Sequence, residues 1–186
     1  MGGWIVLGIV VLVSLGIVVI YNSLVSVRND TQGAWKQIDV QLKRRHDLIP
    51  NLVSTVKGAM EFEQDTLEKV ISARAKAVSA ATPRTKAEAE NVLTQALGRL
   101  FAVMENYPAL KSNQNIMQLQ EELTSTENRI SFARQLYNDL VANYRTKIQV
   151  FPNNLISSFF NFRPEEYFET EEAARAVPPV NLSIRK

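Results

Sequence analysis

The feature that most constrains this chain is an uninterrupted apolar run near its start. Residues 4–21 read WIVLGIVVLVSLGIVVIY, with no charged residue and with Ser14 as the single polar interruption. As a helix rising about 1.5 Å per residue, the run would span roughly 27 Å, close to the roughly 30 Å hydrocarbon core of a bilayer. Aromatic rings favour membrane interfaces, and an aromatic residue stands at each end of the run. The run therefore predicts a transmembrane anchor that contains Trp4, Leu7, Leu12, Ile17 and Tyr21.

Two other interpretations of the run fit the sequence less well. A secretory signal has a basic start and a small-residue cleavage site, whereas this run follows MGG and is followed by NSLVSVRND. A buried helix of a soluble protein normally keeps a polar stripe along one face, and this run has none. We therefore interpret residues 1–23 as an uncleaved anchor.

Basic residues close to the anchor predict its orientation. None precedes the run, and those that follow it are Arg28, Lys36, Lys43, Arg44 and Arg45. The positive-inside rule then places the C-terminal bulk in the cytoplasm and the short N-terminus outside. A periplasmic or extracellular bulk is an open alternative, because only Arg28 and Lys36 lie within about 20 residues of the span.

Composition argues against several classes of function. The chain has 21 basic and 19 acidic residues, a net charge of +2, which is not the strongly basic balance of a nucleic-acid-binding domain. Beyond the anchor, Gly33, Gly58 and Gly98 are isolated, so no glycine-rich loop can hold a phosphate. His46 is the single histidine and cysteine is absent, whereas a metal site needs three or four convergent ligands. We expect no nucleic-acid partner, no metal, no cofactor and no catalytic residue, and hence no enzyme.

The rest of the chain has helical rather than strand periodicity. The strongest pattern, over residues 113–150, repeats an apolar position every seven residues, which is typical of coiled-coil-like packing. Asn113 is a suitable N-cap, and Pro152 cannot continue the helix. A further helix is predicted over residues 85–106, opened by Thr82 and Pro83. The repeated positions of the strongest pattern are Ile116, Leu123, Ile130, Tyr137, Tyr144 and Phe151.

The first helix after the anchor contains a proline. Its heptad positions, from Trp35 to Val70, keep their phase across Pro50, although Glu63 interrupts the series. We therefore predict one helix over residues 24–80 that is kinked at Pro50, where the bond to the His46 carbonyl is lost. The alternative is a tight turn near Asp47 that would make two helices. The fold class predicted is all-α: an N-terminal transmembrane helix followed by an antiparallel bundle of three to four long helices.

The C-terminal segment differs in composition from the bundle. Residues 24–150 are predicted to form the bundle, and residues 151–186 a tail with a short helix followed by an extended or disordered end. The aromatic part of the tail is too short to be stable alone, so it must dock on the bundle, on the membrane interface or on a partner. We favour its own bundle. The aromatic residues are Phe159, Phe160, Phe162, Tyr167 and Phe168.

The two rows of heptad positions described above, one on each long helix, are called apolar seams here. Polar residues lie beside both seams, and two hypotheses account for them. Most are expected to form a solvated face. The alternative is one buried network in which Glu127 faces Arg45 or His46 and fixes helix register. Its candidate members are Arg45, His46, Asn51, Glu127 and Asn128.

Four blocks of sequence resemble the LemA family of bacterial proteins. They are YNSLVSVRND, AWKQIDVQLKRRHDLIPNLVSTVKG, ENYPALKSNQNIMQLQEELTSTENRISFARQLYND and FPNNLI, in the family's order. The resemblance covers the chain from Trp4 to about Phe168, and a variable stretch near residues 80–90 departs from it. It implies one anchor in the bacterial inner membrane, a cytoplasmic antiparallel helical bundle, and kinship with magnetosome-membrane proteins that suggests roles in membrane organisation. It carries over no catalytic residue.

These observations favour a membrane-anchored, non-enzymatic helical scaffold that self-assembles and organises membrane or membrane-protein complexes. Long apolar seams on a rigid anchored rod suit lateral association, in which tethering raises effective concentration. The expected partners are lipid, further copies of the chain and other membrane proteins. The alternative is an adaptor that presents its aromatic and acidic tail to a partner membrane protein.

Overall fold

The computed structural model describes residues 2–58, 60 and 63–168. Every regular element in these ranges is a helix, which confirms the predicted all-α class. The elements are α1 (Gly2–Lys57), α2 (Gln64–Ser79), α3 (Pro83–Met104), α4 (Pro108–Lys111), α5 (Gln114–Gln149) and α6 (Asn153–Phe159).

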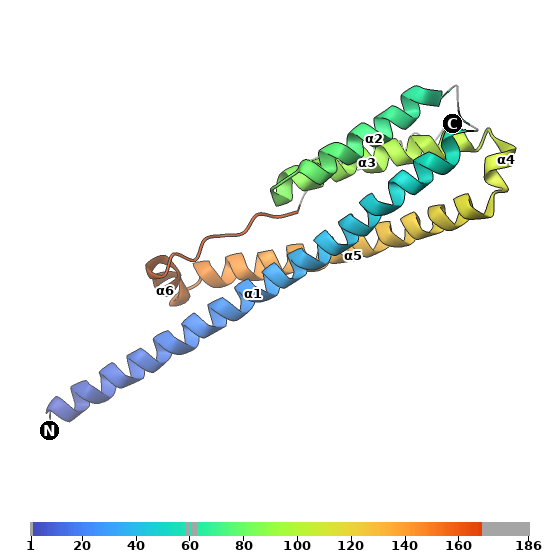
Figure 1. Ribbon diagram of the computed structural model, residues 1–186. Helices are drawn as coiled ribbons and strands as arrows, with labels where there is room; N and C mark the ends of the chain where they lie inside the picture. Colours follow the sequence, from blue (N-terminus) through green and yellow to red (C-terminus); the bar gives the residue numbers. More distant parts are fainter. Residues whose placement is uncertain (1, 59, 61–62, 169–186) are drawn as a thin grey trace, which may run out of the picture.

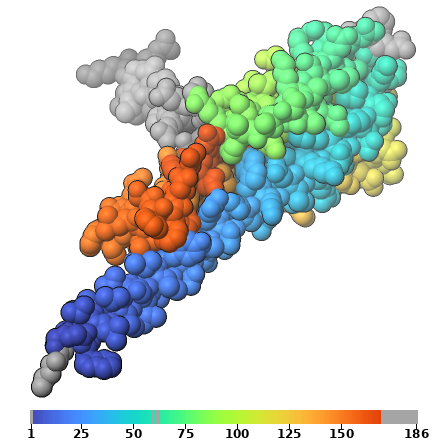
Figure 2. Space-filling model, turned by 60° about the vertical axis from the view of Figure 1, so that its left-hand side comes forward, coloured from blue at the N-terminus to red at the C-terminus, as the bar shows by residue number. Residues whose placement is uncertain are grey.

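Two long helices form the axis of the molecule. Helix α5 runs antiparallel to α1 along most of its own length, and α2 and α3 form a hairpin beside the far half of α1 (Figure 1). Helix α6 lies at the end of α5, next to α1, and the chain then runs back along the bundle (Figure 1). The first part of α1 extends alone beyond all the other helices (Figures 1 and 2).

The buried side chains form three clusters in succession along α1. The distal core joins α1, α2, α3, α4 and α5; the middle core joins α1, α3, α5 and the C-terminal segment; the proximal core joins α1 and α5, with α6 packed against it. The α1 residues in the distal core are Ile49, Leu52 and Val56, in the middle core Ala34, Ile38 and Leu42, and in the proximal core Leu24 and Val27.

Helix α1 is continuous through Pro50, so the alternative of a turn near Asp47 is wrong. Pro50 has no N–H, so it cannot donate a hydrogen bond to the carbonyl of His46. That carbonyl instead accepts a hydrogen bond of 2.7 Å from Arg74 Nε of α2. A side chain from the neighbouring helix thus supplies the donor that the proline removes.

The predicted helix over residues 24–80 is wrong in its second half. Helix α1 ends at Lys57, just before Gly58, and α2 begins only at Gln64. The heptad phase nevertheless survives the reversal of the chain, because Val56 of α1 and Val70 of α2 both face the distal core. The constant heptad phase therefore indicated that these residues share one core, and it did not indicate that they belong to one helix.

Helix α5 follows its sequence pattern closely. Asn113 caps it, since its Oδ1 accepts hydrogen bonds from the backbone N–H groups of Asn115 at 3.0 Å and Ile116 at 3.4 Å. The repeated positions from Ile116 to Tyr144 are buried. Phe151, the last predicted position, is exposed instead, because α5 ends at Gln149 and the seam ends with it.

Candidate functional site

The N-terminal part of α1 is an apolar rod that no other described element covers. It is long and apolar enough to cross a membrane, and none of its most apolar stretch is buried against the rest of the described chain. Figure 2 shows it projecting from the bundle. A fully apolar helix surface left open in this way requires a nonpolar surrounding. The five predicted anchor residues Trp4, Leu7, Leu12, Ile17 and Tyr21 are all exposed.

Helix α6 lies against α1 at the inner end of this rod. The ring centroid of Tyr21 lies 4.8 Å from that of Phe160 and 5.7 Å from that of Phe162. Phe162 packs against the proximal core, whereas Phe159 is 83% exposed. The aromatic tail residues predicted from sequence therefore divide into a docked group and an open one.

Residues 160–168, here called the C-terminal strap, bind the bundle through both backbone and rings. Asn138 pairs with the backbone of Phe168 through bonds of 2.9 and 3.2 Å, and the Tyr137 hydroxyl donates to the Glu166 carbonyl at 2.7 Å. Phe168 is fully buried in the middle core, and Tyr167 packs against it. The predicted extended or disordered end falls largely on residues 169–186, outside the described residues, and the division into bundle and tail stays a prediction.

Burial of the strap contact changes the acidity of its tyrosine. The pKa of Tyr137 is raised to about 12, first because burial disfavours the phenolate and then because Glu165 and Glu166 are close. The protonated hydroxyl, which holds the strap, is therefore maintained at all ordinary pH values.

A buried ionic cluster joins three helices in the middle of the bundle. Arg45 of α1 donates through Nη1 to Glu90 Oε2 of α3 at 3.1 Å and through Nη2 to Thr94 Oγ1 at 2.7 Å. His46 Nε2 lies 2.6 Å from the other oxygen of Glu90. Glu127 Oε2 of α5 lies 2.9 Å from Arg45 Nη1, as an ion pair without hydrogen-bond geometry. The side chains of Arg45 and Glu90 are only 4% and 5% exposed, against 40% for Glu127.

The structure places only part of the predicted polar network in this cluster. Glu127 lies beside Arg45, as the hypothesis had it, but Asn51 and Asn128 are exposed. Sequence reasoning missed Glu90, the central carboxylate. A signal existed, because Glu90 follows Ala87 and precedes Leu93 at helical three-residue spacing, which places it on the inner stripe of α3.

The cluster has the character of a structural tie between helices. His46 is buried against Glu90, and within residues 2–58, 60 and 63–168 no three His, Asp or Glu side chains converge as metal ligands would. A carboxylate shared by two buried cationic or donor groups fixes the relative position of α1 and α3.

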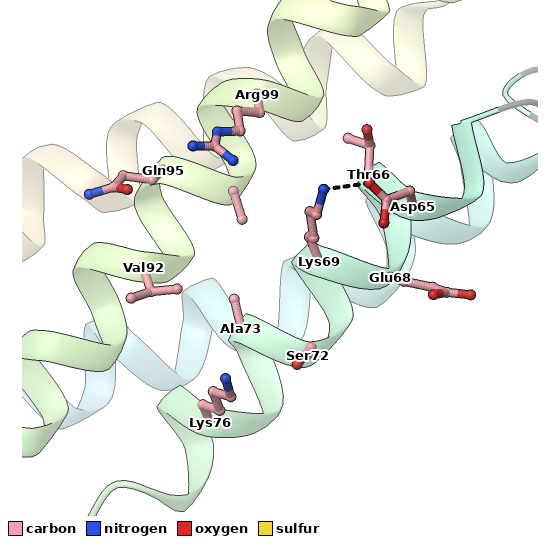
Figure 3. A pocket seen from close by; sticks show the side chains of 11 residues that line it. Asp65, Thr66, Glu68, Lys69, Ser72, Ala73, Lys76, Val92, Gln95 and Arg99 are labelled. Atoms are coloured by element: carbon pink, nitrogen blue, oxygen red, sulfur yellow. Dashed lines mark hydrogen bonds and ion pairs between the residues drawn. The ribbon is translucent and has the colours of Figure 1, made fainter.

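An open groove between α2 and α3 is lined by mixed charges (Figure 3). Lys69 pairs with Asp65 one turn away on the same helix, and Lys76 and Arg99 stand on opposite walls. Asp65 and Glu68 stand near one end of the groove and Lys76 near the other (Figure 3). The charged side chains do not converge on one point, so this groove offers no built ligand site.

A second groove, on the surface shared by α1 and α5, has an apolar centre and also contains the cationic side chains of Lys36 and Arg129. Val40, Phe132 and Leu136 are exposed there, and Phe132 is 73% exposed. Gln41 also lines this groove, and its Oε1 is buried without a hydrogen-bond partner. An exposed phenylalanine beside two further aliphatic side chains is typical of a surface that another molecule covers.

The fold and the open apolar rod together define a membrane-associated helical protein. The family model described as "LemA family" matches residues 34–182, so the chain belongs to the LemA family. It is 26% identical over 179 residues to magnetosome protein MamQ 2 of Paramagnetospirillum magneticum, covering 82% of this chain and 66% of that relative. It is 25% identical over 155 residues to protein LemA of Metamycoplasma hominis, covering 83% of this chain and 71% of that protein.

Proposed function

We propose that this protein is a non-enzymatic scaffold that is anchored in the bacterial inner membrane and self-associates through the apolar α1–α5 groove. The observation that carries the proposal is the exposed groove with Val40, Phe132 and Leu136. A second copy of the chain is the occupant we assign to it, because copies tethered to one membrane meet at high effective concentration. The relation to proteins named for the magnetosome supports a role in organising membranes.

The test is the mass of the full-length protein in mild detergent. Replacing Phe132 and Leu136 with Ser removes the apolar groove while leaving the buried seam intact, and it should convert an oligomer into a smaller species. The matched control is Val92→Ser, which changes a comparably exposed apolar residue of α3 and should leave the mass unchanged. A wild-type protein that is strictly monomeric at micromolar concentration would refute self-association, and an oligomer that survives the double replacement would refute this groove.

We also propose that the bundle lies in the cytoplasm and the N-terminus outside. Arg28 and Lys36 follow the anchor closely, and basic residues next to a span favour the cytoplasmic side. Because the chain contains no cysteine, single cysteines at Gly3 and Met117 can report the two sides through a membrane-impermeant thiol reagent. The proposal requires labelling of intact cells at position 3 only, and labelling at position 117 only would reverse the orientation.

The adaptor function, in which the aromatic and acidic tail binds a partner membrane protein, is the second candidate, and the acidic end of that tail contains Glu169, Glu171 and Glu172. Removing residues 151–186 would also strip Phe168 from the middle core, so a loss of partner binding would not be specific. Truncation after Phe168 keeps the strap and removes the acidic end. An adaptor should lose capture of its partner membrane protein on this truncation while keeping its helicity and mass.

A further inference from the structure

We propose that α6 and the turn before it form a second membrane contact, which inserts into the interfacial layer of the lipid beside the anchor. The starting observation is an exposed apolar face at the base of the bundle. Phe151, Leu155 and Phe159 are all exposed and recur every four residues, so Leu155 and Phe159 lie on one side of α6. Ile156, the residue after Leu155, packs against the proximal core and so joins α6 to the bundle.

The position of this face relative to the anchor identifies lipid as its occupant. Tyr21 closes the lipid-facing run, and its ring contacts Phe160 at 4.8 Å between centroids. Phe160 in turn contacts Phe159 at 5.0 Å. The exposed face is therefore continuous with the end of the anchor, at the depth where aromatic rings favour the boundary between headgroups and acyl chains.

The composition of the segment suits that depth. Residues 148–162 contain no Asp, Glu, Lys or Arg, so their insertion would remove no charge from water. Arg163, the first charged residue after the segment, is exposed and can reach lipid phosphates.

Local bonds hold α6 rigidly in this place. The Ser157 hydroxyl donates to the Ile148 carbonyl of α5 at 2.8 Å and is itself buried. At the other end Asn161 adopts a left-handed conformation with φ of 58°, and the Phe162 N–H bonds back to the Ser157 carbonyl at 2.8 Å. This helix-ending motif turns Phe162 onto Tyr21 and leaves Phe159 pointing away from the proximal core.

Site-directed spin labelling of the full chain tests the inference, since the sequence has no cysteine to remove. Single variants Phe159→Cys and Leu155→Cys carry a nitroxide in vesicles of phosphatidylethanolamine and phosphatidylglycerol. Collision with oxygen reports lipid, and collision with a water-soluble nickel chelate reports water. Val10→Cys in the anchor is the lipid reference, and Ile71→Cys on exposed α2 is the aqueous reference.

Interfacial insertion requires nickel accessibility at positions 155 and 159 to be several-fold below that at position 71, with oxygen accessibility retained. Accessibility to nickel equal to that at position 71 would overturn the inference. Protection from both reagents would overturn it as well, because protein rather than lipid would then cover α6. If position 10 itself is accessible to water, both the membrane anchor and the insertion of α6 are refuted. If position 10 is in lipid and positions 155 and 159 are not, only the insertion of α6 is refuted.

Discussion

Replacing Glu90 with Gln removes the carboxylate that Arg45 and His46 share. Breaking a buried ion pair by removing one partner costs about 3–5 kcal/mol, because the remaining charge stays buried. Here Glu127 lies 2.9 Å from Arg45 and still neutralises it. We therefore expect a loss near the lower limit, about 3 kcal/mol. Glu127→Gln should cost about 1 kcal/mol or less, because the Glu127 side chain is 40% exposed and its pairing with Arg45 lacks hydrogen-bond geometry.

Urea unfolding in mild detergent, followed by far-ultraviolet circular dichroism, measures these differences. A loss of about 3 kcal/mol corresponds to a fall in Tm of about 6–12 °C for a domain of this size. The matched control is Glu88→Gln on the same helix, which removes an exposed carboxylate paired with Arg84 and should be near neutral. If Glu90→Gln were no more destabilising than this control, the buried cluster would not stabilise the bundle.

A double-mutant cycle separates the two carboxylates. Arg45→Met combined with Glu90→Gln should show strong coupling, since both changes remove the same buried pair. The cycle of Arg45 with Glu127 should show weaker but measurable coupling. A coupling near zero in the second cycle would remove α5 from the network.

Two further predictions follow from single hydrogen bonds. Arg74→Met should lower the free energy of unfolding in urea by about 1–2 kcal/mol, because it leaves the His46 carbonyl without a donor. In a Pro50→Ala background, where a backbone N–H returns, the loss should be smaller. An unchanged loss would contradict the proposed compensation. Tyr137 has its pKa raised to about 12 in the folded state, so its contribution is complete below pH 10 and is lost as the pH rises from 10 to 12. Tyr137→Phe should therefore lower stability at neutral pH, through loss of the bond to the Glu166 carbonyl, and flatten the alkaline decline; a decline as steep as in the wild type would assign it to other groups.

Short-range sequence patterns predicted the helices better than they predicted the connections between helices. The cap at Asn113 and the opening at Thr82 are short-range hydrogen bonds within a few residues, and both occur as expected. The reversal after Lys57 was missed because apolar phase depends on which core a residue faces, and α1 and α2 face the same one. Two signals were available, because glycine favours helix ends and Gly58 follows Lys57, and because Glu63 interrupts the heptad series just before α2.

Part of the candidate site could be predicted from the local pattern of the helices. Arg45, His46 and Glu127 stood beside recognised seams, so their proximity could be inferred. Glu90 lay on a helix whose rotation against α1 no local pattern specified, and the exposed groove around Phe132 became visible only when the burial of each α5 residue was known.

The sequence by itself determined that the chain is helical, that its first helix suits a bilayer and that α5 carries one long seam, because hydropathy and helical period act between residues close in the chain. The tertiary structure alone decided that Glu90 meets Arg45 and that Phe160 meets Tyr21. These pairs are far apart in sequence, and they form only after the chain reversals and the cores between helices set how each helix is placed and turned.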